Sequence, residues 1–156
     1  MITFFLPGLF AGGAEAILLR LAAEFSRRGI PCQFVVASSG GVWENRVPTD
    51  VQLIHLGSSK PIRAIPALVR HLRSHRPHAV ISTVFAANLA AIAACRIARV
   101  RCVIREAYWT GEELSGRTRL STLANRLAVK QLYPRADAII SLSRGLASHV
   151  RTLAHI

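Results

Sequence analysis

A glycine-rich stretch near the start of the chain has the residue types of a ligand-binding loop. Residues 2–6 form a short apolar run typical of a buried strand, and residues 14–28 carry apolar side chains at helical spacing. Gly12 and Gly13 stand between them, shortly before Glu15 in the first predicted helical turn. Glycines in this place let a ligand approach the backbone amides of a helix N-terminus, which attract anions. They could equally serve a tight turn that needs φ > 0, and the sequence leaves both explanations open.

Two well-known phosphate-binding motifs do not match this loop. The P-loop needs a lysine and then a serine or threonine after its second glycine, whereas Gly13 is followed by Ala14 and Glu15. The dinucleotide-binding fingerprint needs the spacing G-x-G-x-x-G, but the glycines here are spaced G-x-x-x-G-G. If the loop binds a ligand, its site therefore belongs to another class.

A carboxylate follows a predicted strand at residues 101–105, at the edge where parallel sheets bind ligands. Glu106 could orient a hydroxyl group or act as a base there. It could equally pair with the neighbouring Arg105, so both roles stay open. No catalytic triad of serine, histidine and aspartate, and no pairing of cysteine with histidine, can be argued from the spacing.

Three histidines lie close together at the spacing H-x-x-x-H-x-x-H: His71, His75 and His78. Histidines four residues apart lie on one helix face, as zinc ligands do. No cysteine or carboxylate lies nearby in the sequence, and interleaved arginines would repel a cation: Arg70, Arg73 and Arg76. We therefore expect a solvated basic face and no metal site.

The charge balance is strongly basic, with 20 lysines and arginines against 8 acidic residues and a formal net charge of +12. Such a surface favours polyanions: nucleic acid, anionic lipid headgroups or phosphorylated substrates. A predicted helix near residues 65–76 and the segment before it concentrate this charge through Arg63, Arg70, Arg73 and Arg76. Each basic residue near an anionic membrane adds about 1 kcal/mol of attraction, so this face could dock there. It could equally be an ordinary solvated helix exterior.

Short apolar runs alternate with helical patterns along the 156 residues. The predicted strands are residues 2–6, 32–37, 51–56, 78–83, 101–105 and 137–142. This alternation predicts an α/β fold, a single Rossmann-like domain with a doubly wound parallel sheet of about six strands and helices on both faces. Three widely spaced cysteines in apolar segments, with no membrane-spanning run or secretory signal, predict free thiols and a cytoplasmic protein.

Four motifs, in order, resemble those of GT-B glycosyltransferases of the GT4 type. They are GGAE at residues 12–15, RPHAVI at 76–81, AAN at 86–88 and ADAIISLS at 136–143. The resemblance covers essentially the whole chain and implies the N-terminal, acceptor-side domain over residues 1–156. GT-B enzymes hold the nucleotide-sugar mainly in a C-terminal domain, whose signature in this group is a pair of spaced glutamates. No two glutamates here lie eight positions apart, as that signature requires, so the resemblance implies that the donor-binding half is absent.

The resemblance also implies an activity and roles for particular residues. The full enzyme would transfer a sugar from a nucleotide-sugar to a glycan or lipid-linked acceptor, with retention of configuration and without a bound metal. This domain would bind no cofactor and would be inactive without a C-terminal donor-binding half. Gly12 and Gly13 would face the donor's phosphate or sugar. Three residues would line the acceptor side, with the glutamate as the candidate catalytic residue: Glu106, Asn88 and Tyr108. Many similar enzymes sit on the inner membrane face, so the resemblance also implies a peripheral contact of the basic face with anionic lipid.

Two other interpretations stay open. One is a basic module that binds nucleic acid by charge, but the chain has no recognised nucleic-acid motif and few aromatic residues to stack on bases. We therefore expect no specific nucleic-acid partner. The other is an inactive remnant of a truncated gene. Salt-sensitive binding to DNA without binding to lipid vesicles would favour the nucleic-acid-binding module.

Overall fold

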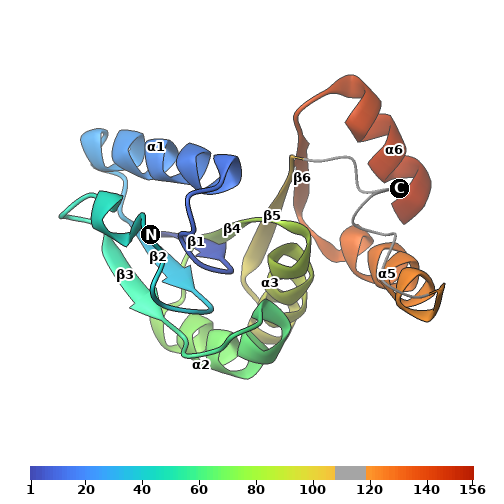
Figure 1. Ribbon diagram of the computed structural model, residues 1–156, viewed down its shortest axis with the longest axis horizontal. Helices are drawn as coiled ribbons and strands as arrows, with labels where there is room; N and C mark the ends of the chain where they lie inside the picture. The colour runs from blue at the N-terminus through green and yellow to red at the C-terminus, as the bar shows by residue number, and fades with distance from the viewer. Residues whose placement is uncertain (108–118) are drawn as a thin grey trace.

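Six parallel strands form one sheet, in the order β3-β2-β1-β4-β5-β6 (Figure 1). The computed structural model describes residues 1–107 and 119–156. The strands are β1 Ile2–Leu6, β2 Cys32–Val36, β3 Gln52–His55, β4 Ala79–Thr83, β5 Arg101–Glu106 and β6 Ala138–Ser141. The predicted doubly wound α/β fold is confirmed, and each predicted strand end agrees with the structure to within one residue.

Helices cover both faces of this sheet. The longer ones are α1 Gly13–Arg27, α2 Ile65–His75, α3 Phe85–Ala98, α5 Arg119–Leu132 and α6 Arg144–Ala154. In Figure 1, α1 lies on one face, while α2 and α3 lie on the opposite face. Short single-turn helices lie in the connections, at η1 Glu44–Arg46, η2 Pro61–Ala64 and η3 Tyr133–Arg135.

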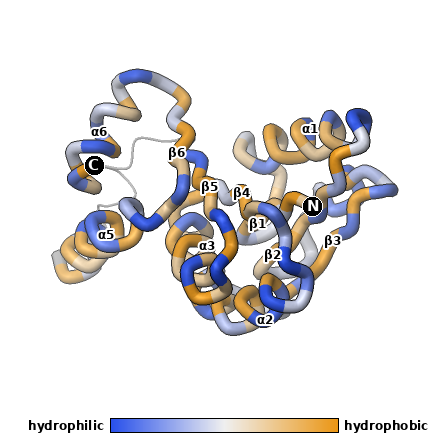
Figure 2. Tube along the Cα trace, turned by 180° about the vertical axis from the view of Figure 1, so that it is seen from behind, coloured by the Kyte–Doolittle hydropathy of each residue, from blue (hydrophilic) through white to orange (hydrophobic). Residues whose placement is uncertain are grey.

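The two faces of β1 bury different side chains and so define two hydrophobic cores. Phe4 and Leu6 pack with Leu18 of α1 in the core on one face. Phe5 belongs to the larger core on the other face, with residues of α2 and α3. All three β1 side chains are fully buried, as expected for a central strand of a parallel sheet. The hydrophobic colour of the central strands in Figure 2 follows from this two-sided burial.

Small residues let α3 pack closely against the sheet. Four alanines of this helix have no exposed surface: Ala87, Ala90, Ala91 and Ala94. Cys95 of α3 and Cys102 of β5 are buried free thiols, as the sequence predicts. Although α3 is apolar, no helix in the described parts of the chain has both the length and the hydropathy to cross a membrane.

The loops that follow β1 and β2 lie against each other. The backbone N–H of Trp43 donates to the Leu9 carbonyl oxygen at 3.0 Å. Gly41 allows this close approach, because a Cβ there would lie 2.4 Å from the same carbonyl oxygen. The contact supports the segment that leads into Gly12 and Gly13.

Candidate functional site

The sheet order creates a switch point between β1 and β4. From the centre of the sheet outward, the strand order is β1, β2, β3 on one side and β4, β5, β6 on the other. The helices that follow β1 and β4 lie on opposite faces of the sheet. Doubly wound folds bind ligands at such a point, outside the carboxyl ends of the strands. Gly12 and Gly13 follow β1 and Asn88 follows β4, so three predicted site residues lie beside it.

Two residues beside the switch point have a positive φ without being glycines. Ala11 has φ 72°, and Val84, the N-cap residue of α3, has φ 74° and ψ 128°. Such conformations cost of order 1–3 kcal/mol, are least expected of a β-branched residue, and concentrate at ligand sites. The remaining non-glycine residues of positive φ in the described chain end helices: Arg76, Arg99 and His155. Sequence reasoning missed Ala11 and Val84, because neither residue type signals this conformation.

Gly12 and Gly13 do not use the conformational freedom of glycine. Gly12 is the N-cap of α1 with φ −90°, and Gly13 is the first residue of that helix. The described glycines with positive φ are others: Gly29, Gly40 and Gly57. The explanation that this pair serves a turn with φ > 0 is therefore wrong, since Ala11 adopts that conformation instead.

The two glycines differ in what surrounds them. A Cβ on Gly12 would lie 2.3 Å from Oε2 of Glu15, so the carboxylate of this buried glutamate folds back over the start of α1. A Cβ on Gly13 would meet nothing within 4 Å. The helix N-terminus thus has an acidic side chain over Gly12 and open space at Gly13.

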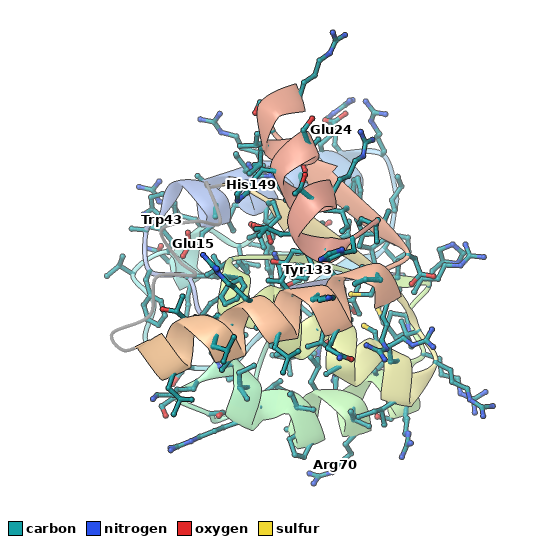
Figure 3. All side chains as sticks on the ribbon, turned by 90° about the vertical axis from the view of Figure 1, so that its right-hand side faces the viewer. Glu15, Glu24, Trp43, Arg70, Tyr133 and His149 are labelled. Atoms are coloured by element: carbon teal, nitrogen blue, oxygen red, sulfur yellow. The ribbon has the colours of Figure 1, made fainter. Side chains whose placement is uncertain are left out.

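A buried polar cluster lies at the end of β5. The Asn88 amide donates from Nδ2 to Oε1 of Glu106 at 2.8 Å and to the Arg105 carbonyl oxygen at 3.2 Å. The Tyr133 hydroxyl donates to the same Oε1 of Glu106. Tyr133, at the centre of Figure 3, and Asn88 are fully buried, and Glu106 is only 3% exposed. The structure therefore brings Glu106 and Asn88 together, while Tyr108 lies outside the described residues.

Sequence reasoning missed Tyr133, because its contact with Glu106 spans 27 residues and no local pattern signals it. Glu106 itself is the last residue of β5, paired with Ser141 of β6, rather than a loop residue. This position explains its burial. One polar atom of Asn88 is not satisfied: its buried Oδ1 has no hydrogen-bond partner in the described structure.

Burial raises the pKa of the Glu106 carboxyl above its ordinary value. The hydrogen bonds from Tyr133 and Asn88 and the charge of Arg105 oppose this shift without cancelling it. Arg105 is the preceding strand residue and points to the other face of the sheet, where its Nη1 donates to Oγ1 of Thr83 at 3.4 Å. The carboxyl therefore keeps its proton to a higher pH than an exposed glutamate would.

The predicted basic face divides into two parts. All four of its arginines are exposed, and Arg70 points away from the body of the protein in Figure 3. Arg73 instead donates from Nη2 to the Ile97 carbonyl oxygen of α3 at 3.3 Å. Arg76 ends α2 in the left-handed conformation. Of the four arginines of the predicted basic face, Arg73 and Arg76 lie next to the end of α3.

The three histidines do not act as one group. His71 is buried, and its Nε2 lies 2.9 Å from Nε2 of Gln33, while its ring stacks on His75 with centroids 4.0 Å apart. Burial, with a smaller effect of the nearby His75, lowers the pKa of His71 to about 4. His78 lies instead near Arg101, with Nη1 3.5 Å from Nε2. Within the described ranges no group of histidine, cysteine or acidic side chains is placed to hold a metal ion.

This geometry can be set beside known proteins. The model of the glycosyl transferase 4-like domain matches residues 12–155. The fold is similar to MurG of Acinetobacter baumannii, with a TM-score of 0.61 and 14% identity over 90% of this chain. It is also similar to the lipopolysaccharide outer core galactosyltransferase WaaB in its apo form, with a TM-score of 0.65 and 14% identity over 97% of this chain. Among curated proteins, no sequence matches significantly.

The chain belongs to the glycosyl transferase 4-like domain family, and its fold is that of one half of a GT-B glycosyltransferase. It spans 40% of the MurG chain and 42% of the WaaB chain. The resemblance read from the sequence motifs is thereby confirmed.

A pair of glycine substitutions tests the open space at Gly13. Gly13→Ala should leave the free energy of unfolding unchanged or raise it by up to about 1 kcal/mol, because the Cβ has room and alanine favours helices. Gly41→Ala should lower it by roughly 1–3 kcal/mol, because its Cβ would collide with the Leu9 backbone. Urea midpoints measure both. Equal destabilisation by the two substitutions would contradict the open space around Gly13.

Replacement of Glu106 tests the buried carboxyl. A raised folded-state pKa means that the bound proton stabilises the fold at low pH, and that this stability is lost as pH rises through the folded pKa. Glu106→Gln mimics the neutral carboxyl and keeps an acceptor for Tyr133 and Asn88. It should therefore raise the melting temperature by a few degrees near neutral pH.

The gain from Glu106→Gln should shrink as the pH falls toward about 4. Glu24→Gln is the matched control, because hydrogen bonds from Arg27 and Arg28 lower the pKa of Glu24 to about 2. It should give no stabilisation at neutral pH. Thermal melts at a series of pH values measure both variants, and a gain for Glu106→Gln that does not change with pH would contradict the raised pKa.

Proposed function

We propose that this chain is the acceptor-side domain of a retaining glycosyltransferase, which moves a sugar from a nucleotide-sugar to a glycan or lipid-linked acceptor. The observation that carries the proposal is the pair of strained residues, Ala11 and Val84, beside the switch point of a glycosyl transferase 4-like fold. Strain of this kind is concentrated at ligand sites. The likeness to WaaB, a galactosyltransferase of the lipopolysaccharide outer core, supports a glycan-bearing acceptor.

The start of α1 is the proposed donor side. The open space at Gly13 would let the donor's phosphate or sugar reach the helix N-terminus. At Gly12 the Glu15 carboxylate would repel a phosphate, but it can accept hydrogen bonds from sugar hydroxyls. We therefore assign the phosphate to the Gly13 side and a sugar hydroxyl to the Gly12 side.

The end of β5 and the start of α3 form the proposed acceptor side. Oδ1 of Asn88 has no partner within the described structure, but Asn88 is fully buried, so we assign it a supporting place beneath the acceptor side rather than a direct contact with the acceptor. Glu106 is buried and is not accessible to a ligand. We therefore assign it a positioning role, in which its carboxylate holds the Asn88 amide in place. Tyr108, which lies outside the described residues, stays a sequence prediction for this side. No step of the proposal uses a metal or a cofactor held by this domain.

A donor-binding half is the proposed partner of this domain. GT-B sugar transfer takes place between two domains, and this chain spans less than half of the MurG chain and of the WaaB chain. Alone, it should bind UDP- and GDP-sugars no more tightly than a Kd of ~1 mM, about −4 kcal/mol. Calorimetry measures this, and micromolar binding by the isolated chain would overturn the need for a partner.

The function itself is tested by joining this chain to a donor-binding half and measuring nucleotide release from UDP- and GDP-sugars that depends on an added glycan or lipid-linked acceptor. Gly13→Ala should reduce kcat/KM at least tenfold, a loss of about 1.4 kcal/mol of transition-state stabilisation, because its methyl group fills the space meant for the donor. A urea midpoint for this variant that is not lower than that of the original chain separates the effect from misfolding. Full activity of Gly13→Ala would remove the glycine loop from the donor site.

We further propose a peripheral contact with anionic membrane through the exposed arginines of the α2 face. The chain should co-sediment with anionic but not with neutral vesicles, and salt should release it. Arg63→Glu combined with Arg70→Glu should abolish binding. A matched control with the same change in charge, Arg20→Glu with Arg144→Glu, should retain most of it.

Equal loss in both double variants would show that net charge alone drives vesicle binding, against a defined α2 face. Salt-sensitive binding to DNA of any sequence, without vesicle binding, would favour a nucleic-acid module instead.

A further inference from the structure

The amino edge of the sheet, opposite the switch point, holds a pocket that is rich in arginine. It has a volume of about 510 Å³ and forms where the ends of α2 and α3 turn back toward β4 and β5. Its lining residues are Arg73, Arg76, Pro77, Ala98, Arg99 and Val100. Half of the lining is therefore cationic, and the other half is apolar.

Helix stability explains only part of this arrangement. The C-terminus of a helix favours cations, and Arg73 fits that role because its guanidinium donates to the Ile97 carbonyl oxygen. Arg76 and Arg99 are the C-cap residues of α2 and α3, with φ 42° and φ 59°. Glycine is the usual residue in this conformation because a side chain there costs energy. Both positions thus keep a guanidinium group where a glycine would be less strained.

The three guanidinium groups also lack acidic partners. No ion pair joins Arg73, Arg76 or Arg99 to an acidic residue in the described chain, whose ion pairs are Glu24 with Arg27 and Arg28, and Glu44 with His55. Asp137, just before β6, has its Oδ2 engaged by the Cys102 backbone N–H at 2.8 Å. Like charges that share a pocket repel one another, so a bound anion would stabilise the arrangement.

We propose that this pocket binds an anion with two or more phosphate groups. Guanidinium groups pair with phosphate through two parallel hydrogen bonds, and three of them can neutralise more than one phosphate. The volume is within the range of small-molecule sites, and the apolar wall of Pro77, Ala98 and Val100 can contact an uncharged part of the ligand. Because the pocket lies at the opposite edge of the sheet, the proposal does not depend on sugar transfer.

Calorimetry of the whole chain with inorganic pyrophosphate at low salt tests the pocket. We expect saturable binding with a Kd of about 100 µM or below. Arg99→Gly removes one guanidinium group and suits the left-handed conformation, so the variant should fold and bind at least tenfold more weakly. Arg96→Ala is the matched control, since Arg96 is an exposed arginine of α3 outside the pocket, and it should bind within about twofold of the original chain. Equal weakening by both substitutions, or no saturable binding, would overturn the site.

A second arm distinguishes a soluble ligand from a lipid headgroup with the same chemistry. Vesicles of phosphatidylcholine with cardiolipin present two phosphates per anionic lipid. The ligand is a lipid headgroup if three results agree: the chain binds these vesicles, Arg99→Gly weakens the binding, and pyrophosphate displaces the chain from them. If pyrophosphate binds and the vesicles do not compete with it, the ligand is soluble. If Arg99→Gly leaves both interactions unchanged, the pocket is not the site.

Discussion

The burial of β1 on both faces is the constraint on which the rest of the structure depends. Phe4 and Leu6 need a cover on one side and Phe5 needs one on the other, so helices must lie on both faces of the sheet. The two neighbours of β1 are both parallel to it, and parallel strands are joined only by crossovers. All carboxyl ends therefore meet at one edge, and the helices after β1 and β4 diverge there. The switch point follows from packing and needs no ligand to create it.

The same topology gives the two edges of the sheet opposite electrostatic character. α1 and α3 begin at the carboxyl edge, where positive helix ends attract acidic groups, and Glu15 lies at the start of α1. α2 and α3 end at the amino edge, where negative helix ends attract cations, and arginines collect there. The dipoles account for the sign of charge at each edge. They do not account for an open space at Gly13, nor for three guanidinium groups around one pocket, and these features motivate the two proposed sites.

Strain and burial at the carboxyl edge have different physical consequences. Val84 holds an unfavourable backbone conformation, which the packing of β4 and α3 must overcome. Glu106 holds a carboxyl away from water, which the hydrogen bonds from Asn88 and Tyr133 only partly offset. Both features lower stability, and both fix the orientation of the residues around Asn88. Groups held in place in this way lose little further entropy when a ligand binds, which is the physical ground for the proposed site.

The sequence by itself determined the α/β alternation, the strand positions and the glycine loop, because these depend on local periodicity and on residue types at strand ends. It also predicted Glu106 as a site residue through its place after a strand, and Asn88 through the family resemblance, and both roles stay predictions. Only the tertiary structure decided that Ala11, rather than either glycine, takes the left-handed conformation, and that Gly13 faces open space. It alone joined Tyr133 to Glu106 and placed Arg99 beside Arg73 and Arg76, pairs that are distant along the chain. Such contacts depend on how crossovers bring separate elements together, and a local pattern contains no record of that distance in space.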